Sequence, residues 1–163
     1  MIILGIDPGT ATTGYGFIEK YSFKNKKGKP LKCVDFGIIQ TSPTVSAPDR
    51  LKKLHNDLNF LIKKYRPEVL AIERVYFFKN LKTAMPVSQA KGVILLTAAK
   101  KKIPVYEFTP MEVKKIIVNY GWAEKKLVQK KVKSLLRLKD DKIKDDAADA
   151  LAVAICCARL LKD

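Results

Sequence analysis

The chain has 163 residues, 47% of them apolar, and its 32 Lys and Arg residues against 16 Asp and Glu residues give a formal net charge of +16. A chain of this length typically forms one domain, here residues 1–163, and buries roughly 70% of the surface of its unfolded chain. No apolar run could span a membrane and the first residues resemble a strand, so we expect a cytoplasmic protein with no membrane contact. The excess positive charge favours a nucleic-acid partner over a merely solvated Lys-rich surface.

The N-terminal part of the chain has the pattern of three consecutive strands. Strand-forming residues dominate ranges 2–7, 14–20 and 31–41, with a Lys-rich, hairpin-like turn at 24–30. Asp7 ends the first strand, directly before a Pro-Gly pair that turns the chain into the second. A buried and unpaired carboxylate there would be unfavourable, so a cation or a hydrogen-bond donor should face Asp7.

Helices and strands alternate in the rest of the chain. In order, the pattern predicts a polar loop bounded by Pro43 and Pro48, a helix at 49–65, a strand at 68–73, a helix at roughly 83–101 that Pro86 kinks or starts, a strand at 103–108, a short helix from Pro110 that Gly121 breaks, a basic helix at 124–138 and an Ala-rich helix at about 143–161. Three antiparallel strands followed by this alternation indicate an α/β domain with a mixed five-stranded sheet and helices on both faces. Apolar residues of the helix at 83–101 spread wider than one stripe, which is typical of burial on two sides, for example against a second subunit.

Soft metal ligands are scarce in this chain. It has one His and three Cys, Cys33, Cys156 and Cys157. An odd number of Cys, two of them adjacent in an Ala-rich stretch, indicates buried reduced thiols rather than a disulfide or a metal site. Any metal should therefore be a hard cation held by carboxylates. We assign no role to His55, which lies on a predicted helix away from the acidic residues.

Acidic residues that are far apart in the sequence can meet at one edge of the predicted sheet. Asp7 ends the first strand and Glu73 ends the fourth, so their side chains would emerge together if those strands pair. At the start of the last helix, spacing alone allows Asp146 with Asp149 or Asp145 with Asp149 on one face. So many like charges need cations beside them. Two divalent ions about 4 Å apart would meet that need and would clamp the attacking and leaving oxygens of a phosphodiester.

Each carboxylate also has an ordinary structural interpretation. Asp7 could cap the Pro-Gly turn, and Glu73 could pair with Arg74 or with a Lys. Asp145 or Asp146 could interact favourably with the helix dipole. Taken one at a time, these interpretations are the better ones. Taken together in a basic protein, the carboxylates are better explained by a shared site.

Four segments, in order along nearly the whole chain, carry a family resemblance. They are Leu4-Gly5-Ile6-Asp7-Pro8-Gly9 with Thr13-Gly14-Tyr15-Gly16, Ala71-Ile72-Glu73-Arg74-Val75-Tyr76 with Lys79-Asn80, Gln89-Ala90-Lys91-Gly92, and Asp146-Ala147-Ala148-Asp149-Ala150-Leu151-Ala152. Together they resemble the RuvC family of Holliday-junction resolvases, which have the RNase H-like fold. The Asp-x-Gly-Thr element alone is shared with sugar kinases and actin-like ATPases, but four segments in register are specific.

The resemblance implies a homodimeric, structure-selective endonuclease. It would nick two strands of like polarity symmetrically at a four-way DNA junction, in recombination and repair, alongside a branch-migration helicase complex of the RuvA and RuvB type. It would use Mg²⁺ or Mn²⁺, two ions per active site, for in-line attack of water that leaves 5′-phosphate and 3′-hydroxyl ends. The implied catalytic and metal-binding residues are Asp7, Glu73, Asp146 and Asp149. The resemblance, not the spacing, selects Asp146 over Asp145, and some members have His at this position.

Aromatic and basic residues follow the fourth strand directly. Aromatic side chains beside cations suit stacking on unpaired bases, worth roughly 1–3 kcal/mol per base. Stacking is favoured for Tyr76, which matches an aromatic position of the family, whereas packing beneath the loop is an equal alternative for Phe77 and Phe78. Lys114 and Lys125 match basic positions that the family places along its cleft. The DNA-binding candidates are therefore Tyr76, Phe77, Lys79, Lys82, Lys114 and Lys125.

Other functions compete with this interpretation. A nuclease of the same fold that cuts RNA would lack junction-selective binding and paired nicks. For a non-catalytic DNA-binding module, Asp7→Asn should leave biological activity unharmed. An actin-like ATPase fits poorly, because the chain has no second phosphate loop and is too short for two lobes. Near the end of the fifth strand, a structural hydrogen bond is the better role for Glu107 than metal ligation.

Overall fold

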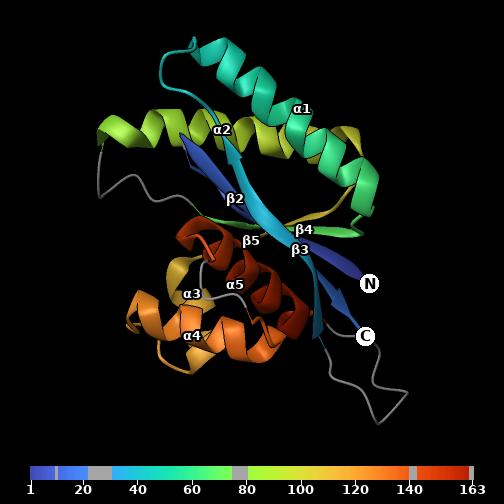
Figure 1. The fold of residues 1–163 in the computed structure, drawn as a ribbon, viewed down its shortest axis with the longest axis vertical. Coiled ribbons are helices and arrows are strands. Elements are labelled where there is room, and N and C mark those ends of the chain that lie inside the picture. Colours follow the sequence, from blue (N-terminus) through green and yellow to red (C-terminus); the bar gives the residue numbers. More distant parts are fainter. Residues whose placement is uncertain (10, 22–30, 75–80, 140–142, 162–163) are drawn as a thin grey trace.

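A computed structural model describes residues 1–9, 11–21, 31–74, 81–139 and 143–161. Its single sheet has the strand order β3-β2-β1-β4-β5 (Figure 1). The strands are β1 (Ile2–Asp7), β2 (Thr12–Lys20), β3 (Leu31–Gln40), β4 (Val69–Glu73) and β5 (Val105–Phe108). β2 is antiparallel to both β1 and β3, whereas β4 is parallel to β1 and β5 is parallel to β4. The predicted mixed five-stranded sheet is confirmed.

Helices cover both faces of this sheet. They are α1 (Ala47–Tyr65), α2 (Leu81–Lys100), α3 (Pro110–Val118), α4 (Lys125–Leu136) and α5 (Asp145–Leu160). α1 and α2 lie on one face, and α3, α4 and α5 lie on the other (Figure 1). None of the helices in the described part of the chain combines the length and apolar character needed to cross a membrane.

Most element boundaries differ from the prediction by one or two residues, and two of these differences have identifiable reasons. α1 begins at Ala47 rather than at 49, because the Ser46 hydroxyl accepts a hydrogen bond from the Asp49 N–H at 3.3 Å and Pro48 fits the first helical turn. β5 begins at Val105 rather than at 103, because the Ile103 N–H is bonded to the Ala98 carbonyl at 3.0 Å. β5 thus starts two residues later than the apolar pattern indicates.

α5 is buried along most of its length. Its Ala-rich turns pack on the sheet and contribute to the larger core cluster together with α3 and α4. Cys156 and Cys157 are fully buried and unbridged, as predicted, while Cys33 is half-buried. Burial raises the pKa of each buried thiol to about 12, so both are protonated at neutral pH.

Glycines in β1 and β2 let α5 lie unusually close to the sheet. Gly5 and Gly16 face each other in the antiparallel register, and Gly14 faces Asp7. A Cβ atom at Gly5 would lie 2.1 Å from the Ala150 carbonyl oxygen, and one at Gly14 would lie 1.9 Å from the Asp146 carbonyl oxygen. Larger residues would push the helix away, so this glycine strip fixes where the acidic start of α5 lies.

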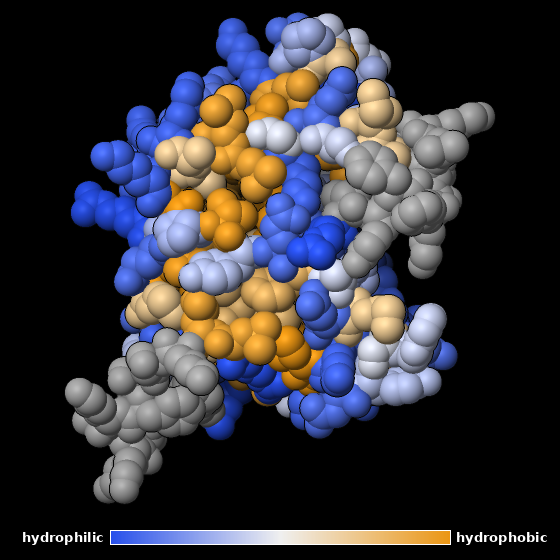
Figure 2. All heavy atoms as spheres, turned by 180° about the vertical axis from the view of Figure 1, so that it is seen from behind, coloured by the Kyte–Doolittle hydropathy of each residue, from blue (hydrophilic) through white to orange (hydrophobic). Residues whose placement is uncertain are grey.

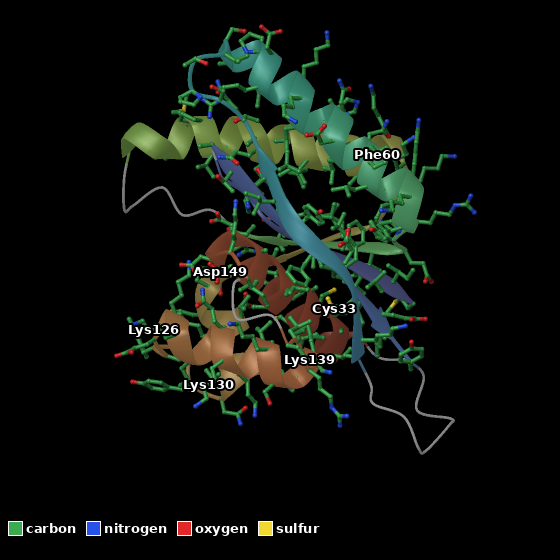
Figure 3. All side chains as sticks on the ribbon, viewed as in Figure 1. Cys33, Phe60, Lys126, Lys130, Lys139 and Asp149 are labelled. Carbon is green, nitrogen blue, oxygen red and sulfur yellow. The ribbon has the colours of Figure 1, made fainter. Side chains whose placement is uncertain are left out.

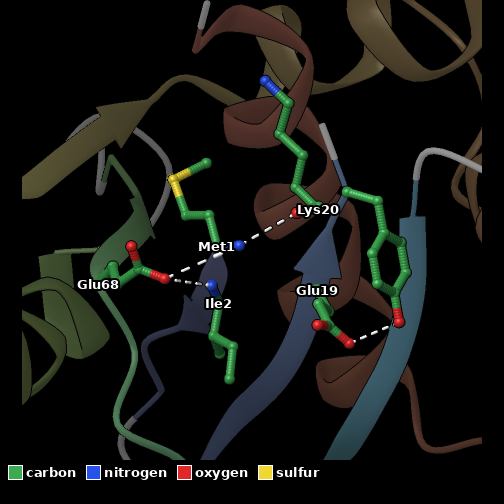
Figure 4. A network of polar contacts seen from close by, with 6 residues as sticks. Met1, Ile2, Glu19, Lys20 and Glu68 are labelled. Atoms are coloured by element: carbon green, nitrogen blue, oxygen red, sulfur yellow. Dashed lines mark hydrogen bonds and ion pairs between the residues drawn. The ribbon is translucent and has the colours of Figure 1, made fainter. Parts of the chain in front are cut away.

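A network of polar contacts holds the start of β1, the end of the strand that lies away from Asp7 (Figure 4). A carboxylate oxygen of Glu68 accepts the Ile2 N–H at 3.0 Å and lies 3.8 Å from the amino terminus. The amino terminus also donates to the Lys20 carbonyl at 3.1 Å, and the Lys20 ammonium donates to the Leu161 carbonyl at 2.6 Å. These bonds connect β1, β2, β4 and the end of α5.

Candidate active site

The central strands β1 and β4 end side by side at one edge of the sheet. Ile6 pairs with Ile72 in the parallel register, so the next residues, Asp7 and Glu73, leave the sheet together. Both side chains are half-buried, and they lie close enough for the Glu73 carboxyl to raise the pKa of Asp7. The strand pairing on which the predicted meeting of these two residues depends is therefore present.

The start of α5 adds further carboxylates to this edge. Close packing at Gly14 holds the Asp146 backbone against β2. Gly14 is also the residue of β2 that pairs with Asp7 of β1. Asp146 and Asp149 are near enough for their negative charges to raise the pKa of Asp7. Both are half-buried. The structure thus brings Asp7, Glu73, Asp146 and Asp149 together.

Asp145 lies apart from this group. Its side chain is 67% exposed and faces α4, where it accepts a hydrogen bond from Gln129 at 3.0 Å and pairs with Lys125 at 3.3 Å. The Gln129 bond, with the Lys125 ammonium, lowers the pKa of Asp145. Asp145 therefore faces α4, whereas the Asp146 backbone lies against β2, and the choice of Asp146 over Asp145 as a metal ligand stays a prediction.

Burial and like charges make the carboxylates hard to ionise together. Burial, followed by the charges of its acidic neighbours, raises the pKa of Asp7 from 3.8 to about 8. Burial and the charge of Asp149 raise the pKa of Glu73. Burial also raises the pKa of Asp149, although the Lys125 ammonium opposes that shift. Crowding of this kind is relieved by a proton or by a cation.

The chemistry of these side chains fits hard divalent ions. Carboxylate oxygens are the ligands that such ions prefer, and their positive charge would relieve the repulsion just described. Among the described residues, however, no three acidic, His or Cys side chains are gathered tightly enough to enclose an ion as they stand. Asp7, Glu73, Asp146 and Asp149 are the carboxylates at this edge that could supply oxygen ligands.

A pocket of about 200 Å³ opens beside the carboxylates. Its polar lining consists of Glu73, Asp149, Lys114 and Lys125, and its apolar lining comes from α3, α4 and α5. The Lys125 ammonium lies 2.8 Å from an oxygen of Asp149. Burial lowers the pKa of Lys125, but the paired Asp149 and Asp145 carboxylates outweigh it and leave that pKa raised. Both lysines predicted to line the cleft therefore lie at the carboxylate site.

Several predicted residues lie where the structure does not describe them. Tyr76, Phe77 and Lys79 fall outside the described residues, and so does the Lys-rich turn at 24–30. The backbone of Lys82 belongs to the first turn of α2, but its side chain is likewise outside the description. These residues stay predictions.

Two polar residues outside the carboxylate group have structural partners. Glu107 lies in β5 and accepts a hydrogen bond from Lys91 at 2.7 Å, with Arg74 at 3.7 Å. This hydrogen bond is the role that the sequence predicted for Glu107. His55 shares a hydrogen bond of 2.7 Å with Thr97, which joins α1 to α2.

Sequence reasoning missed the polar contacts between α4 and α5. Lys125 was expected along a DNA-binding cleft, but here it pairs with Asp149, and Gln129 was given no role. The one available signal was their spacing, because residues four apart share a helix face. That spacing says which side chains point the same way, and not what they point toward.

The sequence matches known proteins along nearly its whole length. Residues 3–157 match the family described as crossover junction endodeoxyribonuclease RuvC. RuvC of Alkaliphilus metalliredigens is 49% identical over 158 residues, 97% of this chain and 93% of that protein. RuvC of Halothermothrix orenii is 45% identical over 156 residues, 96% of this chain and 91% of that protein.

Solved structures give the same result. Thermus thermophilus RuvC in complex with a Holliday junction substrate superposes with a TM-score of 0.85 at 31% identity, covering 96% of this chain and 92% of that one. The fold is therefore the RNase H-like fold of these resolvases. With its family match, its sheet order and its acidic edge, the chain belongs to the RuvC family of crossover junction endodeoxyribonucleases.

Proposed function

We propose that this protein is a Holliday-junction resolvase that nicks two strands of like polarity symmetrically at a four-way DNA junction. The observation that carries the proposal is the gathering of four carboxylates beside a lysine-lined pocket in a chain of the RuvC family. A relative with the same fold, Thermus thermophilus RuvC, forms a complex with a Holliday junction substrate. The net charge of +16 is suited to the phosphates of such a junction.

Membership in the family implies a divalent metal, and we propose Mg²⁺, with Mn²⁺ as a substitute and two ions per active site. When bound, such ions activate the attacking water and stabilise the leaving oxygen of a phosphodiester, which here gives 5′-phosphate ends. Asp7 and Glu73 would hold them from rigid central strands, and Asp146 and Asp149 would do so from α5. Because β1, β4 and α5 are buried over most of their length, these ligands are attached to a stiff frame.

The two lysines of the pocket complete the site. Lys114 and Lys125 line the same pocket as Glu73 and Asp149, so a phosphate beside the carboxylates would lie within reach of both ammonium groups. Their charges would hold the scissile phosphate against a group of side chains that otherwise repels it. Lys114 already lowers the pKa of Glu73, as an ammonium group nearby should.

Paired nicks require two active sites, and we propose that a homodimer supplies them through α2. Met85 is 66% exposed and Leu96 is 56% exposed on this helix. Gly92 lies between them, and a Cβ there would meet nothing within 4 Å. Figure 2 shows a band of apolar side chains on the side of the molecule opposite to that of Figure 1. An exposed apolar helix face that offers a glycine for close approach suits a second copy of the chain.

A synthetic four-way junction tests this function. The purified protein is incubated with the junction and Mg²⁺, and with a linear duplex of the same sequence as control. We expect symmetric nicks in the junction that a ligase can reseal, and an intact duplex. Equal cutting of both substrates, or cutting of RNA instead, would support a different nuclease of the same fold.

Two further proposals concern DNA contacts and partners. Raising the salt concentration should weaken junction binding steeply, with each phosphate contact adding about 0.9 to the log–log slope. Tyr76→Ala should impair cutting more than affinity if Tyr76 stacks on an opened base.

A branch-migration complex of the RuvA and RuvB type is the proposed partner, and pull-down with and without junction DNA measures that association.

A further inference from the structure

One carboxylate of the site already has a cationic partner from the protein itself. Lys125, the first residue of α4, places its ammonium group 2.8 Å from an oxygen of Asp149 and 3.3 Å from an oxygen of Asp145. The Asp149 side chain is only 26% exposed, whereas Lys125 is 51% exposed. The better-shielded member of the pair is thus the one that α5 holds beside Asp7.

An ammonium group and a divalent ion make incompatible demands on such a carboxylate. The ammonium hydrogen-bonds to an oxygen whose lone pairs a metal would use, and its charge repels a cation bound a few ångströms away. The same bond turns Asp149 toward α4, and no three acidic side chains among the described residues yet converge on one point.

We propose that Lys125 competes with divalent metal for Asp149, and thereby sets how tightly the active site binds its ions. This inference rests on the proposed metal-dependent function. Lys125 acts here as a positioning residue, because its effect on the metal passes through the carboxylate of Asp149. The free enzyme therefore binds metal less tightly, and the Lys125 ammonium stays at the site.

The pocket offers the displaced ammonium group another partner. Lys125 lines it together with Lys114, so the phosphate of a bound DNA strand could accept the hydrogen bond that Asp149 gives up. A lysine that exchanges a carboxylate for a phosphate would free Asp149 when substrate is in place. Metal loading would then follow substrate binding without any movement of the backbone.

Neighbouring lysines on the same helix provide matched controls. Lys126 and Lys130 are exposed, and Figure 3 shows both on the outer side of α4, away from Asp149. The ion pairs to Asp145 and Asp149 among the described residues come from Lys125. Substituting Lys126 therefore changes the net charge by the same amount without touching the pair.

Calorimetric titration of Mn²⁺ into chelator-treated protein, without DNA, measures the competition directly. Lys125→Met should bind Mn²⁺ about tenfold more tightly than the wild type, since it loses both the competing hydrogen bond and the repulsion. Lys125→Arg keeps a cation at the site and should stay within about threefold of the wild type. Lys126→Met should be unchanged.

Three outcomes would overturn the proposal: unchanged affinity in Lys125→Met, weaker binding in that variant, or an equal gain in Lys126→Met. Circular dichroism of each variant confirms that the fold is intact before titration. Junction cleavage by the wild type, assayed on the same samples, reports on the proposed function separately. A wild type that cuts junctions while Lys125→Met shows no gain contradicts the competition alone, and a wild type that cuts nothing contradicts the proposed function.

Discussion

The carboxylates at the two ends of β1 lie in opposite electrostatic surroundings. At its start, Glu68 accepts a backbone N–H and lies beside the charged amino terminus, so its negative charge has donors around it. At its end, Asp7 lies among three other carboxylates, and its pKa rises to about 8. The six residues of β1 therefore separate a carboxylate with hydrogen-bond donors around it from a group of carboxylates that repel one another.

The difference shows where this fold gives up stability for binding. The network at the start of β1 connects β1, β2, β4 and the end of α5, and it keeps those elements in place. The acidic end uses that stiffness to hold like charges together, which no isolated segment would do. A site that binds cations needs this excess of negative charge, and the well-bonded opposite end helps to make it tolerable.

The largest effect should come from removing the central carboxylate. Asp7→Asn should lower junction cleavage by more than about 100-fold, since losing a residue that only supports a metal ligand can already cost up to about 100-fold. Junction binding should persist, because the lysines that we propose to contact phosphate are untouched. Gel-shift and single-turnover assays on one preparation separate the two effects. Binding that falls as far as cleavage would argue against a catalytic role for Asp7.

A methyl group at the glycine strip should perturb the same site from a distance. Gly14→Ala places a Cβ against the Asp146 carbonyl, where 1.9 Å is available, so the start of α5 must shift. Overpacking of this kind lowers the free energy of unfolding by about 1–3 kcal/mol. Cleavage should fall even where the variant is fully folded, because the carboxylates of α5 are displaced.

The comparison for the stability effect alone is Gly92→Ala, because Gly92 also lies on the proposed dimer face of α2. A Cβ at Gly92 meets nothing within 4 Å, so in the monomer alanine should stabilise α2 by about 0.5–1 kcal/mol. Urea unfolding measures both variants. If Gly14→Ala unfolds and cuts like the wild type, then close packing on β2 does not position the acidic residues.

The pH dependence of stability should reveal the strained carboxylate. Because the Asp7 pKa is raised from 3.8 to about 8, its protonation stabilises the folded state fully below the unfolded value, and this contribution is lost as pH rises toward 8. In chelator-treated protein, Asp7→Asn and the wild type should melt together near pH 4. By pH 8 the variant should melt at a clearly higher temperature, because it carries no charge at this position, and each 1 kcal/mol corresponds to about 2–4 °C at this chain length.

Saturating Mg²⁺ provides the control for that experiment. A bound cation relieves the repulsion in the wild type, so the difference in melting temperature at pH 8 should shrink. A difference that is the same at pH 4 and pH 8 would contradict the assigned pKa shift. Differential scanning fluorimetry across this range is sufficient for both measurements.

The part of this site that depends on strand pairing could be predicted from the sequence. Asp7 and Glu73 meet because each follows the last apolar residue of a central strand, and parallel pairing aligns those ends. The choice of Asp146 over Asp145 was different. Adjacent helical residues point in directions about 100° apart, and the rotation of α5 is set by its contact with Gly14.

Side-chain partners across two helices were beyond the sequence for the same reason. The basic composition of α4 fits DNA binding, yet Lys125 meets Asp149 only because α4 packs beside the start of α5. The start of β5 depended on how α2 ends, because the Ile103 N–H bonds back to the Ala98 carbonyl before the chain extends. Periodicity predicts which elements form, but their mutual orientation decides which charges face each other.

The smallest effect should come from the satisfied end of β1, where the comparison can be sharpened. Glu68→Gln still accepts the Ile2 N–H but loses the charge beside the amino terminus, and the Glu68 side chain is 64% exposed. The free energy of unfolding should fall by about 0.5 kcal/mol or less, and junction cleavage should match that of the wild type. Urea unfolding and the cleavage assay measure the two quantities. A strong loss of cleavage in Glu68→Gln would mean that the two ends of β1 are coupled, because a charge removed at one end would then be felt by the carboxylates at the other.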